Sequence, residues 1–264
     1  MGVYRTKVTD YGYKRKVAVY SRSIKYGDDL EGNTPEKHFR QSYEDMNVFK
    51  KQKSDERRIR YYQHKVIELI ETAMMNDDLD RALTLTFRES ITSYDYALAE
   101  WQLFLKRLRH ICNQPLKYIC VWEYQRARGR KEGLEIGGVF HFHALMNMGF
   151  MEHSLLERTW KQGYVWIEKI TGNRSRENSI RYITKYCTKE IVYRVQHGED
   201  RRGQRFFFTS NNLLKPVSYV IPERTNLENV IIENLERMIK DGTYDLKDET
   251  GHVMNHVEYV EYRT

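Results

Sequence analysis

Strand-like and helix-like segments alternate from about residue 55 to residue 195, and this alternation limits the folds that the chain can adopt. Apolar residues spaced three and four apart predict helices near 54–75, 93–108, 151–160 and 178–195. Short runs rich in strand-forming residues predict strands at 82–87, 118–124, 139–146 and 164–170. From the strand at 82–87 onward, the order is β-α-β-β-α-β-α. It predicts an α+β fold of the ferredoxin-like (RRM-like) type, an antiparallel sheet with helices packed on one face.

The segments on either side of this region have a different pattern. Residues 1–54 show no sustained period, and we interpret them as an N-terminal extension. Residues 55–220 are interpreted as the main domain. From 223 to 264 the chain has ten acidic and five basic residues, so we predict an acidic C-terminal tail over 221–264, with one helical stretch at 227–239.

The charge of the chain points to a class of partner. The net charge is +7, and the stretch 223–264 contributes −5, which leaves +12 for the other residues. A basic excess suits a polyanionic partner but says nothing about the fold. The three cysteines form no Cys-x-x-Cys pair, which argues against a disulfide framework or a thiolate zinc site. With no apolar signal core and no apolar run of membrane-spanning length, we expect a reduced, soluble, cytoplasmic protein with no membrane partner.

Two histidines, His141 and His143, lie in the middle of a predicted strand. Because strand side chains alternate, both point to one face and Phe142 points to the other. Glu123 lies in the neighbouring apolar strand, where a carboxylate is costly unless it is paired, coordinated or solvated. Two imidazoles and one carboxylate leave coordination positions open, and this donor set suits Mn²⁺ or Mg²⁺, with Zn²⁺ as a further alternative. A His-x-His pair without a metal is the simpler alternative.

Two tyrosines lie four residues apart in the last predicted helix, so Tyr182 and Tyr186 share one face. Each is followed three residues later by a lysine, Lys185 and Lys189 respectively. A tyrosine hydroxyl has a pKa of about 10 and is a weak nucleophile at neutral pH. Nearby lysines favour the phenolate and stabilise the charge of a phosphodiester under attack. The alternative is an amphipathic helix that buries its tyrosine rings.

Together these motifs resemble those of the HUH endonucleases, in particular the rolling-circle replication initiators of phages and plasmids. The segment His141-Phe142-His143 matches the family's His-hydrophobic-His motif, and Glu123 falls where related initiators place a third metal ligand. The helical segment 182–189 matches the tyrosine motif, and the strand at 82–87 resembles the first motif. The likeness covers about residues 55–220 and includes a less specific segment at 203–216.

The resemblance implies a metal-dependent DNA nickase that starts rolling-circle replication. A tyrosine attacks the scissile phosphate, leaves a 5′-phosphotyrosine link and a free 3′-OH primer, and the strand is later rejoined. Two tyrosines imply alternating cleavage and rejoining, and we expect Tyr186 to attack first and Tyr182 second. The implied partners are single-stranded DNA at a replication origin and a separate helicase and polymerase of a bacterial host. This sequence contains no Gly-x-x-x-x-Gly-Lys-Ser/Thr phosphate loop.

DNA binding is predicted at basic residues near the site and at two threonines. Three arginines lie in the basic turn between the strands at 118–124 and 139–146, and a fourth precedes the tyrosines. Such groups suit phosphate contacts, and exposed loop charge explains them about equally well. Thr84 and Thr86 are implied as DNA contacts by the resemblance alone. The predicted basic contacts are Arg126, Arg128, Arg130 and Arg181.

Other classes of protein stay open on this sequence. A non-catalytic protein that binds single-stranded nucleic acid on an RRM-like fold needs neither the histidine pair nor the tandem tyrosines. A metal-dependent hydrolase that uses water would leave the tyrosines structural. Relaxases and single-strand transposases share the tyrosine chemistry, but their motif layout or length fits this chain less well. A covalent protein–DNA link distinguishes the nickase from the binding protein and the hydrolase.

Overall fold

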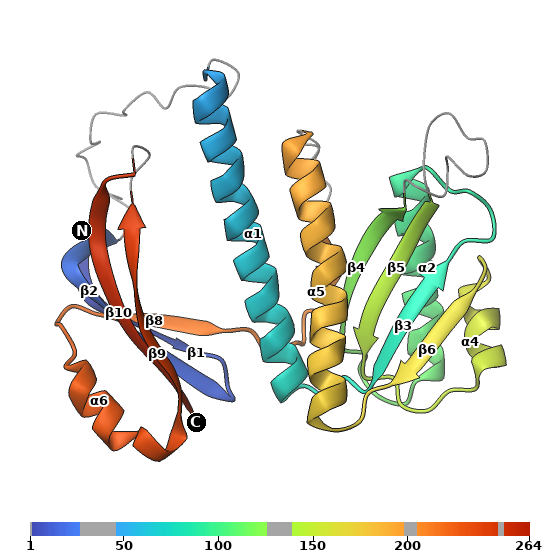
Figure 1. The fold of residues 1–264 in the computed structure, drawn as a ribbon. Coiled ribbons are helices and arrows are strands. Elements are labelled where there is room, and N and C mark those ends of the chain that lie inside the picture. Colours follow the sequence, from blue (N-terminus) through green and yellow to red (C-terminus); the bar gives the residue numbers. More distant parts are fainter. Residues whose placement is uncertain (1, 27–45, 126–138, 198–204, 248–250) are drawn as a thin grey trace. The chain divides into compact units, whose positions relative to one another are not determined.

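Two five-stranded antiparallel sheets, one in each of two units, organise the chain (Figure 1). The computed structural model describes residues 2–26, 46–125, 139–197, 205–247 and 251–264. One unit contains residues 57–214, and we call it the central unit. The other contains residues 1–56 and 215–264, and we call it the terminal unit. The predicted α+β fold is confirmed, with two sheets where the sequence predicts one.

The sheet of the central unit has the strand order expected of a ferredoxin-like fold. Its strands are β3 (Arg81–Thr86), β4 (Tyr118–Gln125), β5 (Val139–Met146), β6 (Val165–Lys169) and β7 (Phe207–Thr209). They lie in the order β6-β3-β5-β4-β7, and all neighbouring pairs are antiparallel. The first and third strands of the motif, β3 and β5, are central, and β7 extends the sheet at β4.

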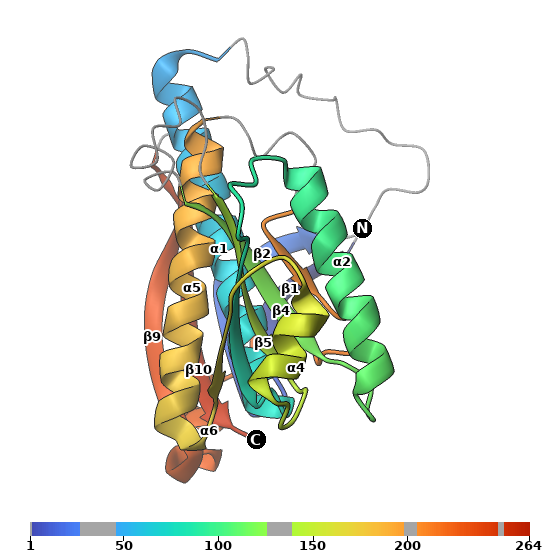
Figure 2. The ribbon, with the colours of Figure 1, turned by 90° about the vertical axis from the view of Figure 1, so that its right-hand side faces the viewer.

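Helices cover both faces of this sheet (Figure 2). On one face lie α2 (Tyr94–Ile111) and α4 (His153–Trp160), as predicted. On the other face, α1 (Val48–Asn76) and α5 (Gly172–Gln196) pack against Ile119, Val121 and Leu145. The prediction of helices on one face holds for α2 and α4 and needs correction for α1 and α5. Because β4 and β5 are apolar on both faces, both faces have to be covered.

Both helices of the second layer begin earlier than predicted. α1 begins at Val48 rather than near residue 54, and α5 begins at Gly172 rather than at 178. Their first turns carry few apolar residues that face the core, so the apolar period starts later than the helix itself.

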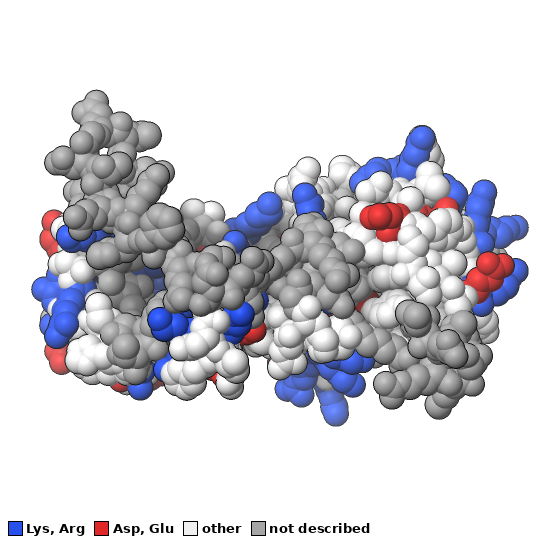
Figure 3. Space-filling view, turned by 90° about the horizontal axis from the view of Figure 1, so that it is seen from above, with Lys and Arg blue, Asp and Glu red and all other residues white. Residues whose placement is uncertain are grey.

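Basic side chains are spread over the described surface. In the view of Figure 3 they lie in several separate groups, with fewer acidic side chains between them. None of the described helices combines the length and the apolar character needed to span a lipid bilayer.

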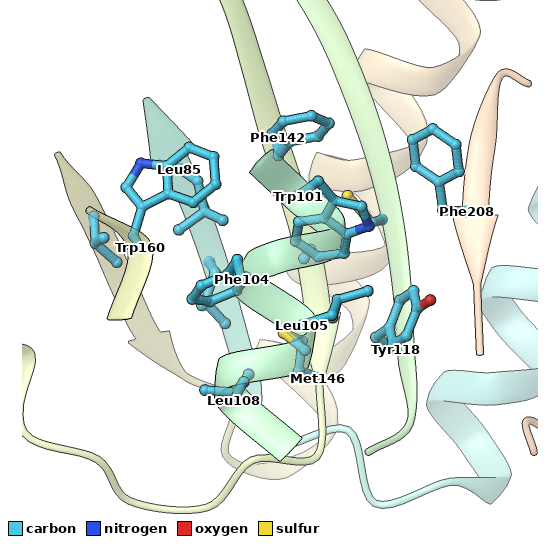
Figure 4. Close-up of a cluster of buried hydrophobic side chains, with 14 of the residues drawn as sticks. Leu85, Trp101, Phe104, Leu105, Leu108, Tyr118, Phe142, Met146, Trp160 and Phe208 are labelled. Atoms are coloured by element: carbon cyan, nitrogen blue, oxygen red, sulfur yellow. The ribbon is translucent and has the colours of Figure 1, made fainter. Parts of the chain in front are cut away.

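The core under α2 fixes which way β5 faces. Ser93 caps α2, and its hydroxyl oxygen accepts a hydrogen bond from Tyr96 N at 3.3 Å. The apolar side of α2 then meets the sheet, where the Trp101 ring stacks on Phe142 with 5.4 Å between the centroids (Figure 4). Phe142 is 2% exposed. With Phe142 in this core, His141 and His143 have to lie on the opposite face.

Both ends of the chain contribute to the sheet of the terminal unit. Its strands are β1 (Gly2–Asp10), β2 (Lys14–Tyr26), β8 (Val217–Ile221), β9 (Met238–Lys247) and β10 (Val253–Arg263). They lie in the order β8-β1-β2-β10-β9, and all neighbouring pairs are antiparallel. α6 (Leu227–Glu233) packs on a valine-rich core formed by Val8, Val17, Val19 and Val260.

The terminal segments therefore differ from the extension and the tail that the sequence predicts. Residues 2–26, within the predicted N-terminal extension, form two paired strands, and the turn between them contains Gly12, with a φ of 81°. The helix predicted at 227–239 ends at Glu233, and a strand begins at Met238. The sheet depends on pairs such as Tyr20 with Val257, which lie at opposite ends of the chain. The local hydrophobic periodicity of the sequence cannot predict a pairing between such distant segments.

Candidate active site

The sheet places the three predicted metal ligands on its α5 face. In the strand register, Glu123 of β4 lies opposite His141 of β5, and Thr84 of β3 lies opposite His143. The two imidazole rings are 6.5 Å apart between centroids, with 23° between their planes. Alternation along β5 thus brings both histidines to the side of the glutamate.

Glu123 is a buried carboxylate with two basic partners, His143 and Lys189. It is 5% exposed. Its Oε1 accepts a hydrogen bond from Lys189 Nζ at 2.5 Å, and its Oε2 lies 3.5 Å from His143 Nε2. Burial alone raises the pKa of this carboxyl, but the contact with His143 and the hydrogen bond from Lys189 outweigh burial and lower the pKa to about 2. The carboxylate is therefore ionised at all physiological pH values.

Tyr182 and Tyr186 of α5 both contact His143. The Tyr186 ring stacks on the His143 ring, with 3.9 Å between the centroids and 15° between the planes. The Tyr182 ring meets His143 edge-on, with 5.5 Å between the centroids. The Tyr182 hydroxyl lies 3.4 Å from His143 Nδ1 and 3.2 Å from Thr84 Oγ1, and Thr84 Oγ1 lies 3.1 Å from the same Nδ1. The two hydroxyls therefore have different surroundings.

Lys185 and Lys189 do not lie beside the tyrosine hydroxyls, where the sequence predicts that they favour the phenolate. Lys189 pairs with Glu123, and Lys185 Nζ lies 5.8 Å from the centroid of the Tyr186 ring. The pKa of Tyr186 is raised above its usual value, first by burial and then by its hydrogen bond with Tyr182 and by the charges nearby. In this state the geometry does not favour a Tyr186 phenolate.

The donor set fits a divalent cation in its chemistry. Glu123 and His143 already face each other, and the buried Nε2 of His143 has no hydrogen-bond partner among the described residues. In the part of the chain that the structure describes, no three His, Cys, Asp or Glu side chains lie close enough together to hold a metal ion as they stand. The ammonium of Lys189 pairs with the carboxylate on which a cation would bind. Glu123, His141 and His143 thus remain the predicted ligands, and Lys189 has to withdraw for them to bind a cation.

The predicted DNA-binding residues fall into three groups. Arg126, Arg128 and Arg130 lie outside the described residues. Arg181 is exposed on α5, one residue before Tyr182. The two threonines have protein partners: Thr84 contacts His143 and Tyr182, and Thr86 Oγ1 donates a hydrogen bond to Tyr164 O at 3.2 Å.

A cavity of about 410 Å³ beside Tyr182 was not predicted. Trp166 of β6 lines it and is 56% exposed, although a core position is the simpler expectation for a tryptophan in a strand. The alternation of β6 contains the signal, because Trp166 and Glu168 fall on the face opposite to buried Val165. The contact of Thr84 with His143 was also missed, because it depends on strand register.

The fold and the site together define a class of protein. It is an α+β protein whose antiparallel sheet carries two histidines and a carboxylate under a helix that directs two of its tyrosines at them. Residues 80–191 match the family model of the replication-associated protein ORF2/G2P. The match runs from β3 through most of α5 and so includes every site residue described above. It supports a replication initiator family. No curated protein and no solved structure matches the chain.

Proposed function

We propose that the protein is a rolling-circle replication initiator that nicks single-stranded DNA through a tyrosine and later rejoins the strand. The observation that carries this proposal is the position of His143. Its ring contacts Tyr182 and Tyr186 of α5, and its Nε2 faces the ionised Glu123. Two candidate nucleophiles and a candidate cation site thus meet at one imidazole, within the segment matched by the replication-associated family.

The proposed reaction exchanges one phosphodiester for another. The tyrosine oxygen bonds to phosphorus, the bond from phosphorus to the 3′ oxygen breaks, and the hydroxyl proton of the tyrosine ends on that 3′ oxygen. The products are a 5′-phosphotyrosine and a 3′-OH. Because the number of phosphoester bonds is unchanged, attack by a 3′-OH on the link rejoins a strand without ATP.

The residues of the chain have separate tasks in this scheme. Glu123, His141 and His143 would hold Mn²⁺ or Mg²⁺, which when bound stabilises the charge of the phosphate under attack. Tyr182 and Tyr186 supply the two nucleophiles. Lys189, released from Glu123, would bind a phosphate oxygen, and the exposed Arg181 would bind the DNA backbone.

The surroundings of the two tyrosines suggest an order of attack. The Tyr182 hydroxyl lies within hydrogen-bond distance of both His143 Nδ1 and Thr84 Oγ1, whereas burial raises the pKa of Tyr186. We therefore infer that Tyr182 attacks first and that Tyr186 acts in the rejoining step. This order is the reverse of the one that the sequence favours.

A covalent adduct tests the function. The purified protein is incubated with single-stranded circular DNA and Mn²⁺ and run on a denaturing gel. We expect a slower, nuclease-sensitive protein band that EDTA abolishes. Tyr182→Phe and Tyr186→Phe should each reduce the band, with Tyr182→Phe the stronger, and the double variant should abolish it. Tyr193→Phe is the matched control, because Tyr193 lies on α5 and stacks on His197 instead.

The alternatives predict different gels. A non-catalytic binding protein retards DNA in a native gel but forms no band under denaturing conditions. A hydrolase that uses water cuts the circle without becoming attached to it, and the double tyrosine variant still cuts. Absence of an adduct with each of Mn²⁺, Mg²⁺ and Zn²⁺ would refute the nickase proposal. The proposed partners in the host cytoplasm, which are origin DNA, a host helicase and a host polymerase, would then lose their support as well.

A further inference from the structure

The cavity beside Tyr182 has a floor formed by two rows of the central sheet. In one row, Thr84 of β3 lies between Trp166 of β6 and His143 of β5. In the next row, Ala82 lies beside Glu168 of β6. The first half of α5 forms the wall, and the cavity reaches Tyr182 and His143 at one end. Whatever binds there therefore adjoins the proposed nucleophile.

The shape of this cavity suits one flat group. Ala82 carries only a methyl group, which leaves the middle of the floor open. Trp166 stands at the side and is 56% exposed, and a large apolar ring in that position offers a stacking surface. The volume of about 410 Å³ falls in the usual range of small-ligand pockets, roughly 300–1,000 Å³.

The polar groups of the cavity argue against a phosphate and for a nucleobase. Glu168 and Arg174 both line it, so the carboxylate offsets the guanidinium, and an anion gains little there. The amide of Asn178 adds one donor and one acceptor. A carboxylate accepts hydrogen bonds only, so it pairs with an amino group such as that of cytosine, and an asparagine amide pairs well with adenine.

We propose that this cavity binds one unpaired base that adjoins the cut phosphate, and that it selects a base with an exocyclic amino group over thymine. Trp166 stacks on the base, and Glu168 accepts a hydrogen bond from its amino group. The cavity then positions the strand so that the neighbouring phosphate lies at Tyr182. This inference rests on the proposed function, because the ligand is the strand that is nicked.

A random pool of single-stranded oligonucleotides tests the base preference without knowledge of the origin. The protein is incubated with the pool and Mn²⁺, covalent adducts are isolated, and both the attached and the released strands are sequenced. We expect thymine to be depleted at least roughly fivefold at one of the two positions that flank the cut. Preferences at other positions belong to the rest of the DNA-binding surface.

Three variants connect that preference to the cavity. Ala82→Leu fills the floor and Trp166→Ala removes the stacking ring, so both should abolish the preference at that one position. Glu168→Gln places a group that can donate as well as accept, so thymine should be admitted while adduct formation continues. Tyr164→Ala is the matched control, because Tyr164 is 71% exposed just before β6 and lines a different groove. It should leave the preference unchanged.

The outcomes separate this inference from the function on which it rests. Wild-type adducts with no preference at either flanking position overturn the base pocket and leave the nickase intact. A preference that survives all three variants, each shown by circular dichroism to be folded, also overturns it. Absence of adducts from the wild-type protein overturns both the pocket and the proposed function.

Discussion

His143 contacts both tyrosines and the carboxylate, so its orientation decides how the site is arranged. When Nε2 faces a cation, Nδ1 carries the ring proton and donates it to Thr84 Oγ1, 3.1 Å away. The Thr84 hydroxyl is then free to donate to the Tyr182 oxygen, 3.2 Å away. Thr84 is therefore a positioning residue, which fixes the tautomer of His143 and the place of the Tyr182 hydroxyl.

Replacement of Thr84 tests this role. Thr84→Val keeps the shape and removes the hydroxyl, so we expect Mn²⁺ affinity to fall roughly 10-fold and Tyr182-linked adducts to fall relative to Tyr186-linked ones. Thr84→Ser keeps the hydroxyl and should restore both. Calorimetry measures the affinity, and mass spectrometry of digested adducts assigns the tyrosine. Thr86→Val is the control, and equal losses in both valine variants would contradict the role.

Glu123 makes the stability of the central unit depend on pH. Its pKa is about 2 in the folded state against 4.5 for a free group, so ionised Glu123 stabilises the fold above about pH 4.5. That contribution is lost as the pH falls toward 2. A shift of this size corresponds to roughly 3 kcal/mol at most, and exposure of Lys189 makes the expected value lower, about 1–3 kcal/mol.

Urea unfolding of Glu123→Gln measures this contribution. All four tryptophans lie between residues 101 and 166, so their fluorescence reports on the central unit alone. At pH 6 the variant should be about 1–3 kcal/mol less stable than the wild-type protein, and the difference should shrink as the pH falls from 4.5 to 2.5. Glu168→Gln, at an exposed carboxylate, is the control. A difference independent of pH would show that the ionised carboxylate is not its source.

At the scale of elements, the approach of β6 to β3 depends on one glycine. Gly163 lies just before β6, and a Cβ atom there would come within 2.5 Å of Arg88 N and Thr86 O, both backbone atoms. The close approach allows Thr86 N to donate to Tyr164 O at 2.9 Å and Arg88 N to donate to Gln162 O at 2.8 Å. No side chain can be accommodated at residue 163 unless its backbone or that of residues 86–88 moves.

Gly163→Ala should therefore destabilise the central unit by roughly 2–3 kcal/mol in tryptophan-monitored urea unfolding, because backbone has to shift. Gly149→Ala is the comparison, since Gly149 has a φ of 69° and nothing within 4 Å of its Cβ position. It should cost only the strain of a positive φ, about 1 kcal/mol. Equal costs in the two variants would show that the contact with β3 does not limit this position.

Elements with their own periodicity could be predicted from the sequence, and those that depend on distant partners could not. The strands β3 to β6 and the apolar stripe of α2 follow local patterns, and alternation on β5 places both histidines on one face. The pairing of Lys189 with Glu123 depends on where α5 crosses the sheet, which no spacing in the sequence specifies. Likewise, β2 and β10 become strands of one sheet only because the two ends of the chain meet.

At the scale of the whole molecule, the two units should be separable in function. All described residues of the proposed site, and both hydrophobic clusters around the central sheet, lie between residues 57 and 214. The terminal unit has its own core, formed by Val8, Val17, Val19 and Val260. Each unit therefore has an independent source of stability.

Deletion of residues 1–26 tests this independence. The deletion removes β1 and β2, and β2 is the central strand of the sheet ordered β8-β1-β2-β10-β9. The backbone amides of β9 and β10 should then lose most of their protection from hydrogen exchange, because β10 keeps a partner on one side only. Tryptophan fluorescence, the urea midpoint of the central unit and adduct formation with Mn²⁺ should stay within about twofold of the full chain. A folded central unit that forms no adduct would show instead that the terminal unit takes part in binding or cutting the DNA.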